Sequence, residues 1–448
     1  MTLAKGAVGD RRSPALREPA DECVHCGFCL PACPTWLSFG EEMDTPRGRI
    51  DLFRALNQGR LPFTARAALH FDRCLGCMAC LGACPSGVRF DRVIEAAREQ
   101  AEREAPRTLK DRLLRALLFA LFPYPARLRL AGVFLWLFRA SGLLFLLRRA
   151  GLLRRLGRLA ALESLAPRLG PKELFRVLPS RVPARGERRL RVGLVLGCVQ
   201  RVFFPEVNAA TVRVLSAEGV EVEIPRQGCC GALSLHAGRT AEARRLAEDL
   251  LSRFADLSLD LIVVNAAGCG SHLKDLGHLF AKDPDLGPRA RAFAERVRDV
   301  TELLAALPPR SPRAALRSKV AWHMPCHLGH AQRLYAEPRD ALRTVPGLEL
   351  VELGDGGACC GSAGVYNLLW PDAAAEIGER KAKAVAAAGA PILASANPGC
   401  TLHLAGLLRA QGLAVETLHP VEILDRAILE AEASLAQPGG TGIAPGKT

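Results

Sequence analysis

Two cysteine runs near the start of the chain limit its fold and chemistry more than any other feature. Both have the spacing C-x2-C-x2-C-x3-C-P, beginning at Cys23 and at Cys74. This spacing wraps three thiolates around one face of a cubane iron–sulfur cluster, and the fourth cysteine ligates the neighbouring cluster. The runs therefore predict two [4Fe–4S] clusters, one on Cys23, Cys26, Cys29 and Cys84, the other on Cys74, Cys77, Cys80 and Cys33.

Zinc is the rival metal because it also binds soft thiolates. Structural zinc sites close with four ligands from paired C-x2-C units and do not need a third evenly spaced cysteine followed by C-P. The repeated spacing therefore favours iron–sulfur clusters.

The other cysteines of this 448-residue chain do not suggest disulfides, although it has 16 of them. Disulfide frameworks belong to short secreted chains with a signal peptide. The first twenty residues carry Lys5, Arg11, Arg12 and Arg17 with no apolar stretch behind them, so we expect no export signal. A cytoplasmic protein with metal-held thiolates is the consistent interpretation.

The chain divides into segments of different composition. We expect a flexible tail over residues 1–20, an iron–sulfur module over 21–105 with helices near 50–56 and 91–104, and a flexible tail over 437–448. The length allows two or three domains with sizeable cores.

Residues 106–189 form a basic, apolar insert. Between Arg107 and Arg191 there are 20 lysines and arginines against 4 acidic residues, a surplus larger than the net charge of +14. The longest uncharged run, 116–126, is shorter than the roughly 20 residues of a spanning helix. Apolar segments at 113–121, 133–138, 143–147 and 152–165 predict either interfacial helices on anionic lipid or a hairpin packed on a partner subunit.

The basic composition of the insert has two other interpretations. A general preference for arginine in the source genome would also produce basic composition. Nucleic-acid binding is disfavoured, because the residues between the arginines are leucines rather than stacking aromatics.

From residue 190 onward the sequence is duplicated. Four cysteines recur in each half, at offsets of 128, 130, 130 and 131 residues: Cys198, Cys229, Cys230 and Cys269, then Cys326, Cys359, Cys360 and Cys400. Near-constant offsets predict two pseudo-equivalent domains, at 190–310 and 311–436.

Each half alternates short apolar strands with helices. Strands are expected at 190–196, 220–224 and 261–265, and again at 319–323, 348–353 and 391–395. Helices are expected at 206–218, 240–255, 338–344 and 372–388. Fully apolar strands indicate a parallel sheet covered on both faces. The predicted fold class is multidomain α+β, with a helical two-cluster ferredoxin module followed by two pseudo-repeated α/β (Cys-Cys-Gly) domains.

The repeated cysteines follow the carboxyl ends of these strands, where open α/β sheets place their sites. A further iron–sulfur site, a redox-active dithiol pair and zinc all remain open, and soft-ligand chemistry favours a metal or cluster. The adjacent cysteines need a bend that Gly228, Gly231 or Gly361 can supply. Ligand and packing roles are both open for the nearby histidines His272, His323, His327, His330 and His403.

No flavin fingerprint of the form G-x-G-x-x-G follows a strand, so we expect no flavin in this chain and no substrate-oxidising or catalytic residue. Electron transfer is the natural role of such a chain. The competing class is a thiol–disulfide reductase that uses the Cys-Cys-Gly repeats.

The doubled cysteine run followed by two Cys-Cys-Gly repeats resembles the iron–sulfur subunits of glycolate oxidases, from Cys23 to about Leu429. The same modules occur in heterodisulfide reductase B and C subunits and in the C subunit of anaerobic glycerol-3-phosphate dehydrogenase. The resemblance implies an electron-transfer partner of FAD-containing subunits that oxidise glycolate to glyoxylate. It also implies peripheral contact with the cytoplasmic face of the inner membrane and a quinone or other membrane acceptor.

One departure from the related reductases affects this expectation. Their fuller motif ends in C-x2-C and supplies five thiolates to a noncubane cluster. Here Cys269 and Cys400 are each followed, three residues later, by a histidine. Heterodisulfide chemistry is therefore less expected than a related glycolate, lactate or glycerol-3-phosphate dehydrogenase complex.

Overall fold

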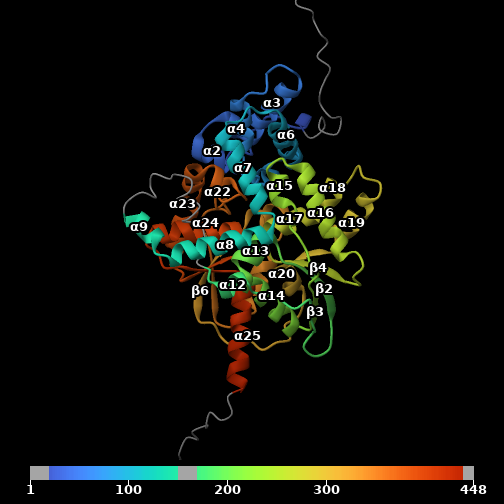
Figure 1. Ribbon diagram of the computed structural model, residues 1–448, viewed down its shortest axis with the longest axis vertical. Helices are drawn as coiled ribbons and strands as arrows, with labels where there is room; N and C mark the ends of the chain where they lie inside the picture. Colours follow the sequence, from blue (N-terminus) through green and yellow to red (C-terminus); the bar gives the residue numbers. More distant parts are fainter. Residues whose placement is uncertain (1–19, 150–168, 437–448) are drawn as a thin grey trace, which may run out of the picture.

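The computed structural model describes residues 20–149 and 169–436 (Figure 1). A small helical module lies at one end of the molecule, above two α/β units, and insert helices cross the middle. The predicted fold class is thus confirmed for the described residues. The expected flexible tails and the apolar segment 152–165 lie outside, or almost entirely outside, the described residues.

The helical module is built from short, well-capped helices. They are α2 (Pro34–Phe39), the 3-10 turn η1 (Glu42–Asp44), α3 (Pro46–Asn57), α4 (Ala65–Asp72), α5 (Ala79–Ala83) and α6 (Phe90–Glu104). Thr45 caps α3 by accepting a 2.9 Å hydrogen bond from the Gly48 amide, and Pro46 fits the first turn. Phe53, Phe71 and Val93 fill the core between α3, α4 and α6.

The insert forms three helices, α7 (Leu109–Leu121), α8 (Pro125–Ala140) and α9 (Leu143–Arg149). Leu128 of α8 is buried against Leu174 and Val202, so one face of the insert packs on the first repeat of its own chain. Among the described residues no single helix is long and apolar enough to cross a membrane. Only α7 and α8 taken together meet that criterion, and they are bent by 107° relative to each other.

The two repeats contain sheets with the same strand order, which supports the duplication. The first sheet has the order β1-β3-β2-β4-β5 and the second β7-β6-β8-β9, with only β1 antiparallel. The first-sheet strands are β1 (Arg181–Val182), β2 (Leu190–Val195), β3 (Val220–Glu223), β4 (Leu261–Val264) and β5 (Val297–Asp299). The second-sheet strands are β6 (Ser318–His323), β7 (Leu348–Glu352), β8 (Ile392–Ser395) and β9 (Glu416–Leu418).

Helices connect these strands, as expected for parallel neighbours. The helices that precede and belong to the first repeat are α12 (Pro171–Leu174), α13 (Cys198–Phe203), α14 (Pro205–Ala217), α15 (Ala232–His236), α16 (Thr240–Phe254), α17 (Ala267–Lys274), α18 (Leu276–Leu279), α19 (Leu286–Arg296) and α20 (Val300–Ala306). Those of the second are the π-turn η2 (His327–Ala331), α21 (Glu337–Arg343), α22 (Tyr366–Leu369), α23 (Pro371–Ala388), α24 (Pro398–Ala410) and α25 (Pro420–Ala436).

The repeats share one hydrophobic core rather than standing apart. α25 of the second repeat packs on α14 of the first, and Val214, Leu424 and Ile428 belong to the same buried cluster. Arg213 reinforces this contact by donating to both carboxylate oxygens of Asp425, at 2.6–3.2 Å. The relative orientation of the two sheets is therefore fixed.

That orientation brings the carboxyl ends of β4 and β8 together. The Ala267 amide donates to the Ala396 carbonyl at 3.1 Å, and the Gly268 amide donates to the Asn397 side chain at 3.2 Å. In both sheets this edge is where the strand order reverses, which is where doubly wound sheets bind ligands. The two binding edges therefore face each other.

Candidate metal centres

The two cysteine runs adopt the same loop conformation. The residues flanking the second cysteine have positive φ in both loops, at His25 (57°) and Gly27 (85°), and at Gly76 (60°) and Met78 (62°). Two of these four are not glycine, so the loops hold backbone conformations that side chains rarely adopt. A loop that curls its cysteines around a common centre accounts for this strain at matching positions.

The second run closes on one cysteine of the first. A small space of about 20 Å³ is lined by Cys33, Cys74, Cys77 and Cys80, together with Gly76 and Met78 among others. These are the four thiols that the spacing predicts as one ligand set. Their soft donors fit an iron–sulfur cluster, and a buried position suits it.

The first run lies at the surface. Cys26 is exposed, Cys23 and Cys29 are half-buried, and the neighbouring Val24 and Phe28 are about two-thirds exposed. Cys84, Cys23 and Cys29 border the same hydrophobic core, which also contains Cys74 and Cys80 of the second predicted set. The two predicted sets thus differ sharply in their access to solvent.

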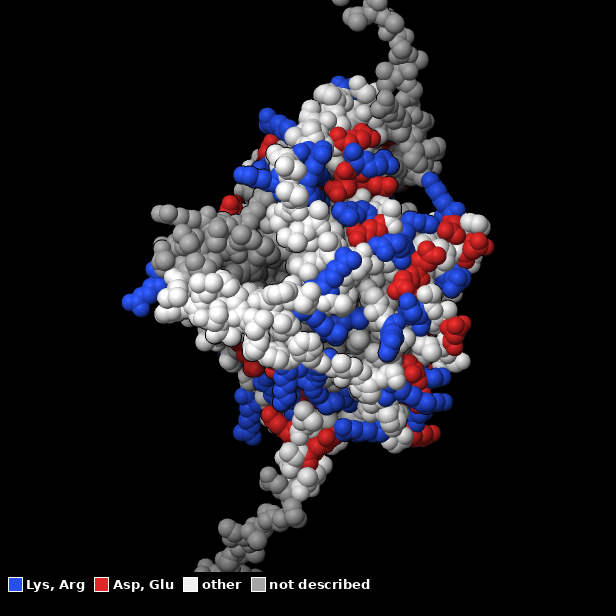
Figure 2. All heavy atoms as spheres, viewed as in Figure 1, with Lys and Arg blue, Asp and Glu red and all other residues white. Residues whose placement is uncertain are grey.

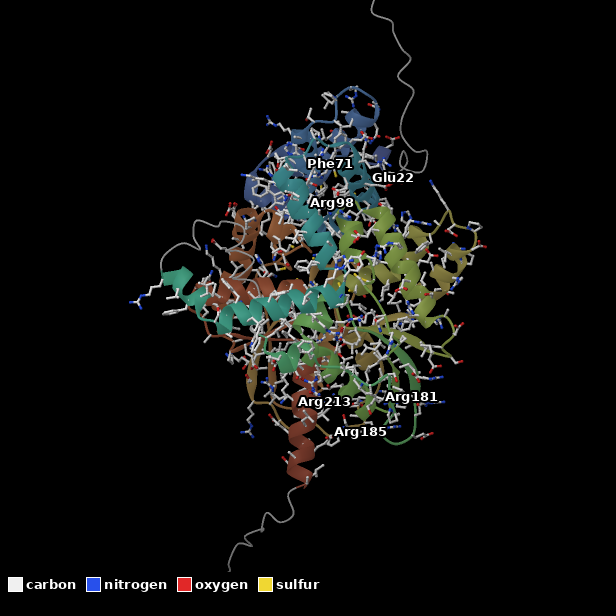
Figure 3. All side chains as sticks on the ribbon, in the orientation of Figure 1. Glu22, Phe71, Arg98, Arg181, Arg185 and Arg213 are labelled. Atoms are coloured by element: carbon white, nitrogen blue, oxygen red, sulfur yellow. The ribbon has the colours of Figure 1, made fainter. Side chains whose placement is uncertain are left out.

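Arg98 fastens the second run to the first repeat (Figure 3). Its guanidinium donates to the carbonyls of Phe71 (3.3 Å), Cys74 and His236 (2.8 Å). On the other side, Nε2 of His327 donates to the Gly76 carbonyl at 2.9 Å. The loop of the second run is therefore held against both repeats.

In each repeat the four cysteines form a line of neighbouring thiols. In the first, Cys198 and Cys229 have their sulfurs 3.3 Å apart, and the line continues through Cys230 to Cys269. In the second, the same order runs through Cys326, Cys359, Cys360 and Cys400. The structure thus brings together all four predicted residues of each repeat.

The predicted bend at the adjacent cysteines comes from the glycine after them. Gly231 has φ 94° and Gly361 has φ 86°. A Cβ atom would lie 2.7 Å from the Ala243 carbonyl oxygen at the first position and 2.4 Å from that of Ala374 at the second. Only glycine fits at these two positions, because it adopts positive φ readily and has no Cβ atom to clash with the carbonyl oxygen. Gly228 does not have positive φ.

A single cavity of about 610 Å³ joins the two repeats. All eight repeat cysteines line it: Cys198, Cys229, Cys230, Cys269, Cys326, Cys359, Cys360 and Cys400. Leu75 of the second run reaches one part of its wall, and Leu128, Leu135 and Phe138 of α8 form another. The cavity therefore connects the ferredoxin module, both repeats and the insert.

Cys326, which lines this cavity, and Cys77 of the second run both resist ionisation by themselves. The hydrogen bond with Cys359 and then burial raise the pKa of Cys326 well above its ordinary value. Burial, followed by the nearby Cys326, raises the pKa of Cys77 well above its ordinary value. Because Cys326 raises the pKa of Cys77, the second run must lie close to the second repeat. A bound metal cation would favour the thiolate forms, so the donor set fits a metal or an iron–sulfur cluster.

The five histidines named from the sequence have different surroundings. Nε2 of His403 donates to the Ala374 carbonyl at 3.1 Å, and His327 donates to Gly76 as described. Burial lowers the pKa of His272 to about 4, and it also lowers the pKa of His330. His323 differs, because neither of its buried ring nitrogens has a hydrogen-bond partner.

Comparison with known proteins matches the architecture segment by segment. A 4Fe-4S dicluster domain matches residues 19–88, and a Cysteine-rich domain matches twice, at residues 192–274 and 320–405. The insert matches the linker region of the glycolate oxidase iron-sulfur subunit at residues 110–166. The chain is 34% identical to the glycolate oxidase iron-sulfur subunit of Escherichia coli (strain K12), over 91% of its own length and 93% of that protein's. The chain belongs to the glycolate oxidase iron–sulfur subunit family.

Two other relatives are similar to different shares of this chain. The probable glycolate oxidase iron-sulfur subunit of Bacillus subtilis (strain 168) is 34% identical over 90% of this chain and 92% of that protein. Lactate utilization protein A of Exiguobacterium sp. is 29% identical over 54% of this chain and 99% of that protein. The sequence-based recognition is therefore confirmed, and the chain is an iron–sulfur protein of an oxidoreductase family.

Several site residues were not identified from the sequence. Arg98 carries no motif, and its partners are 24 to 138 residues away along the chain. The α8 residues of the cavity wall were treated only as part of a docking segment. His323 was named from the sequence only as one of five histidines, and the matching position of the first repeat, Val195, is the signal that could have singled it out.

Proposed function

We propose that this chain is the electron-transfer subunit of a flavin-dependent complex that oxidises glycolate to glyoxylate. An FAD-containing subunit would carry the substrate site, and a quinone or other membrane acceptor would receive the electrons. One observation carries the proposal: the cysteine groups form a series from the exposed first run, through the buried second run, to the cavity between the repeats.

The ligand sets follow the predicted pairing. Cys23, Cys26, Cys29 and Cys84 would hold one [4Fe–4S] cluster, and Cys74, Cys77, Cys80 and Cys33 the other. The eight repeat cysteines would hold a further metal or iron–sulfur site. Groups of this kind accept and release one electron at a time, which is what draining a two-electron flavin requires.

The residues around each set suit different tasks. Val24 and Phe28 place exposed apolar surface beside Cys26, where a flavoprotein subunit can dock. Arg98 and His327 hold the second run at a fixed position against the repeats. Leu75 and Cys359 belong to the same buried apolar cluster, which packs the second run against the second repeat.

The insert supports contact with the cytoplasmic face of the inner membrane. Half of the exposed large apolar side chains of the described residues lie on its three helices: Leu109, Leu113, Leu117, Leu130, Phe134, Leu137, Leu143, Phe145 and Leu146. Figure 2 shows the α8–α9 face as a white band bordered by Lys and Arg. Apolar side chains with a basic border are typical of surfaces that lie on anionic lipid.

Anaerobic purification from the source cells tests the proposal. We expect a yellow flavoprotein to co-purify. Glycolate should reduce the iron–sulfur clusters of the complex, so that their EPR signals appear, but it should not reduce the clusters of the isolated chain. About eight irons per chain would fill the N-terminal sets, and about twelve or more would fill the repeats as well. Absence of acid-labile sulfide, or of any flavoprotein partner, would overturn the proposal.

Lactate is the second candidate substrate for the complex. The relative named lactate utilization protein A aligns over nearly its whole length with about half of this chain. Offering glycolate, lactate and glycerol-3-phosphate in parallel to the same purified complex separates these possibilities. Disulfide reduction by the isolated chain would instead favour a thiol–disulfide reductase.

A further inference from the structure

His323 stands at the carboxyl end of β6, beside two cysteines of the second repeat. A ring nitrogen of His323 and the sulfurs of Cys360 and Cys400 all lie within 4.8 Å of one another. The three residues are buried, and His323 is only 1% exposed. An imidazole nitrogen and two thiol sulfurs thus converge at one point inside the protein.

The surroundings of His323 leave its ring without a protein partner. Neither Nδ1 nor Nε2 makes a hydrogen bond, and it is the one histidine of the described residues for which both buried nitrogens lack one. A buried polar group left unpaired costs about 1–3 kcal/mol. A partner from outside the chain would remove this cost, and the nearby thiols indicate that the partner is a metal.

The first repeat shows what the same position looks like without this feature. In the second sheet His323 pairs with Ser395, whereas in the first sheet Val195 pairs with Val264. Val195 and His323 are 128 residues apart, and Val264 and Ser395 are 131 residues apart. The nearby cysteines of the two repeats have the same offsets, so these positions are equivalent. Val195 packs against Cys198 and Cys229 in an apolar cluster. An imidazole therefore enters only one of two otherwise equivalent sites.

We propose that His323 is a ligand of a thiophilic transition metal held by the second repeat, alongside Cys326, Cys359, Cys360 and Cys400. The first repeat would bind through thiolates alone, so the duplicated domains hold chemically different sites. This inference rests on the proposed metal binding by the repeats, but not on the identity of the oxidised substrate. Zinc and the iron of a cluster both accept thiolate and imidazole together.

A neutral imidazole adds a donor to the second repeat without changing the charge that its four thiolates supply. In Rieske centres, the identity of the ligands, histidine or cysteine, changes the reduction potential of the iron. With iron bound, the two repeats would therefore have different reduction potentials. The second repeat also lies close to the second run, because its Cys326 helps to raise the pKa of Cys77.

The test uses the full-length chain, purified anaerobically and labelled with 15N-histidine. Iron, zinc and sulfide are counted, and pulsed EPR of the reduced protein reports nitrogen bound directly to iron. X-ray absorption at the zinc edge gives the same information if zinc is the metal. We expect directly bound histidine nitrogen in the wild-type protein and its loss in H323V, which copies the first repeat.

Two further variants serve as controls. H323C restores a soft ligand, so it should keep the metal content of wild type while losing the nitrogen signal. H403Q alters a histidine near the same cysteines whose Nε2 already donates to a carbonyl, so it should retain the signal.

Three outcomes would overturn the inference. Metal in the repeats without bound nitrogen in wild type would contradict it and leave the proposed function intact. A nitrogen signal that survives in H323V, or that disappears in H403Q, would assign the ligand elsewhere. A chain with only about eight irons and no zinc would overturn both this inference and metal binding by the repeats.

Discussion

Arg98 carries much of the attachment between the ferredoxin module and the first repeat. Its side chain is only 9% exposed, and its guanidinium satisfies three carbonyl groups from two parts of the chain. Arg92, on the same helix, also reaches the first repeat, but it pairs with Asp275, whose side chain is 47% exposed. The two arginines therefore provide a matched comparison of buried and exposed contacts.

We expect R98A to lower the free energy of unfolding by about 3–5 kcal/mol, because three buried carbonyls lose a charged donor. R92A should cost less than R98A, because Asp275, its partner in the first repeat, is about half exposed. Anaerobic chemical denaturation of the iron-loaded protein measures both. Equal small losses in the two variants would show that Arg98 does not hold the module in place.

At the scale of residues, the structure agrees with the sequence about which residues lie together where the signal is local, and the ligand roles of these residues stay predictions. The spacing of Cys74, Cys77 and Cys80 lies within one short loop, and the structure places Cys33 beside them as expected. The partners of Arg98 and the surroundings of His323 depend on segments far away in the sequence. No local pattern could predict these contacts.

At the scale of elements, the helices and strands that the sequence predicted lie within a few residues of the observed ones, but the long helices α19, α24 and α25 were not predicted. α6 and α16 each differ by one residue at one end, whereas α3 begins four residues before its predicted start because Thr45 and Pro46 cap it. The edge strands β1, β5 and β9 were missed. Each has only two or three residues, and its pairing with a neighbouring strand, rather than its composition, makes it a strand.

The insert illustrates a different limit of sequence reasoning. Its arginines and leucines predicted helices and an external partner, but not that Leu128 and Leu135 would face inward. The structure divides its apolar side chains between a face packed on the chain itself and an exposed face. Only the exposed face is available to lipid or to another subunit.

We expect the triple variant F134S/L137S/F145S to bind anionic vesicles at least tenfold more weakly than wild type, because it loses exposed apolar area. Co-sedimentation with phosphatidylglycerol vesicles measures this. The control is L429S/L435S, which alters exposed leucines of α25, below the insert helices in Figure 1. Unchanged sedimentation of the triple variant would exclude the lipid contact and favour a partner subunit.

At the scale of the whole molecule, the shared cavity was the least predictable feature. The sequence predicted two separate sets of repeat cysteines, and the structure joins them across the facing edges of two sheets. That arrangement depends on α14 packing against α25, whose Arg213 and Asp425 are 212 residues apart. Duplication alone does not say how two copies face each other.

The unequal burial of the two N-terminal runs also determines which predicted cluster loses its iron first. Oxygen and chelators reach Cys26 at the surface, whereas Cys74 and Cys80 lie inside the protein. Under a chelator in air we expect iron to leave in two phases, with about four irons lost first. C26S should abolish the fast phase and leave the slow one, as measured by iron release over time.

Loss of iron in a single phase would show that burial does not protect the second run. If the order holds, the chain would fail first at the site where we propose that the flavoprotein subunit docks. A damaged subunit would then be uncoupled from the incoming electrons while its interior centres were still intact. Repair would need to rebuild only the outermost centre, without unfolding the rest of the protein.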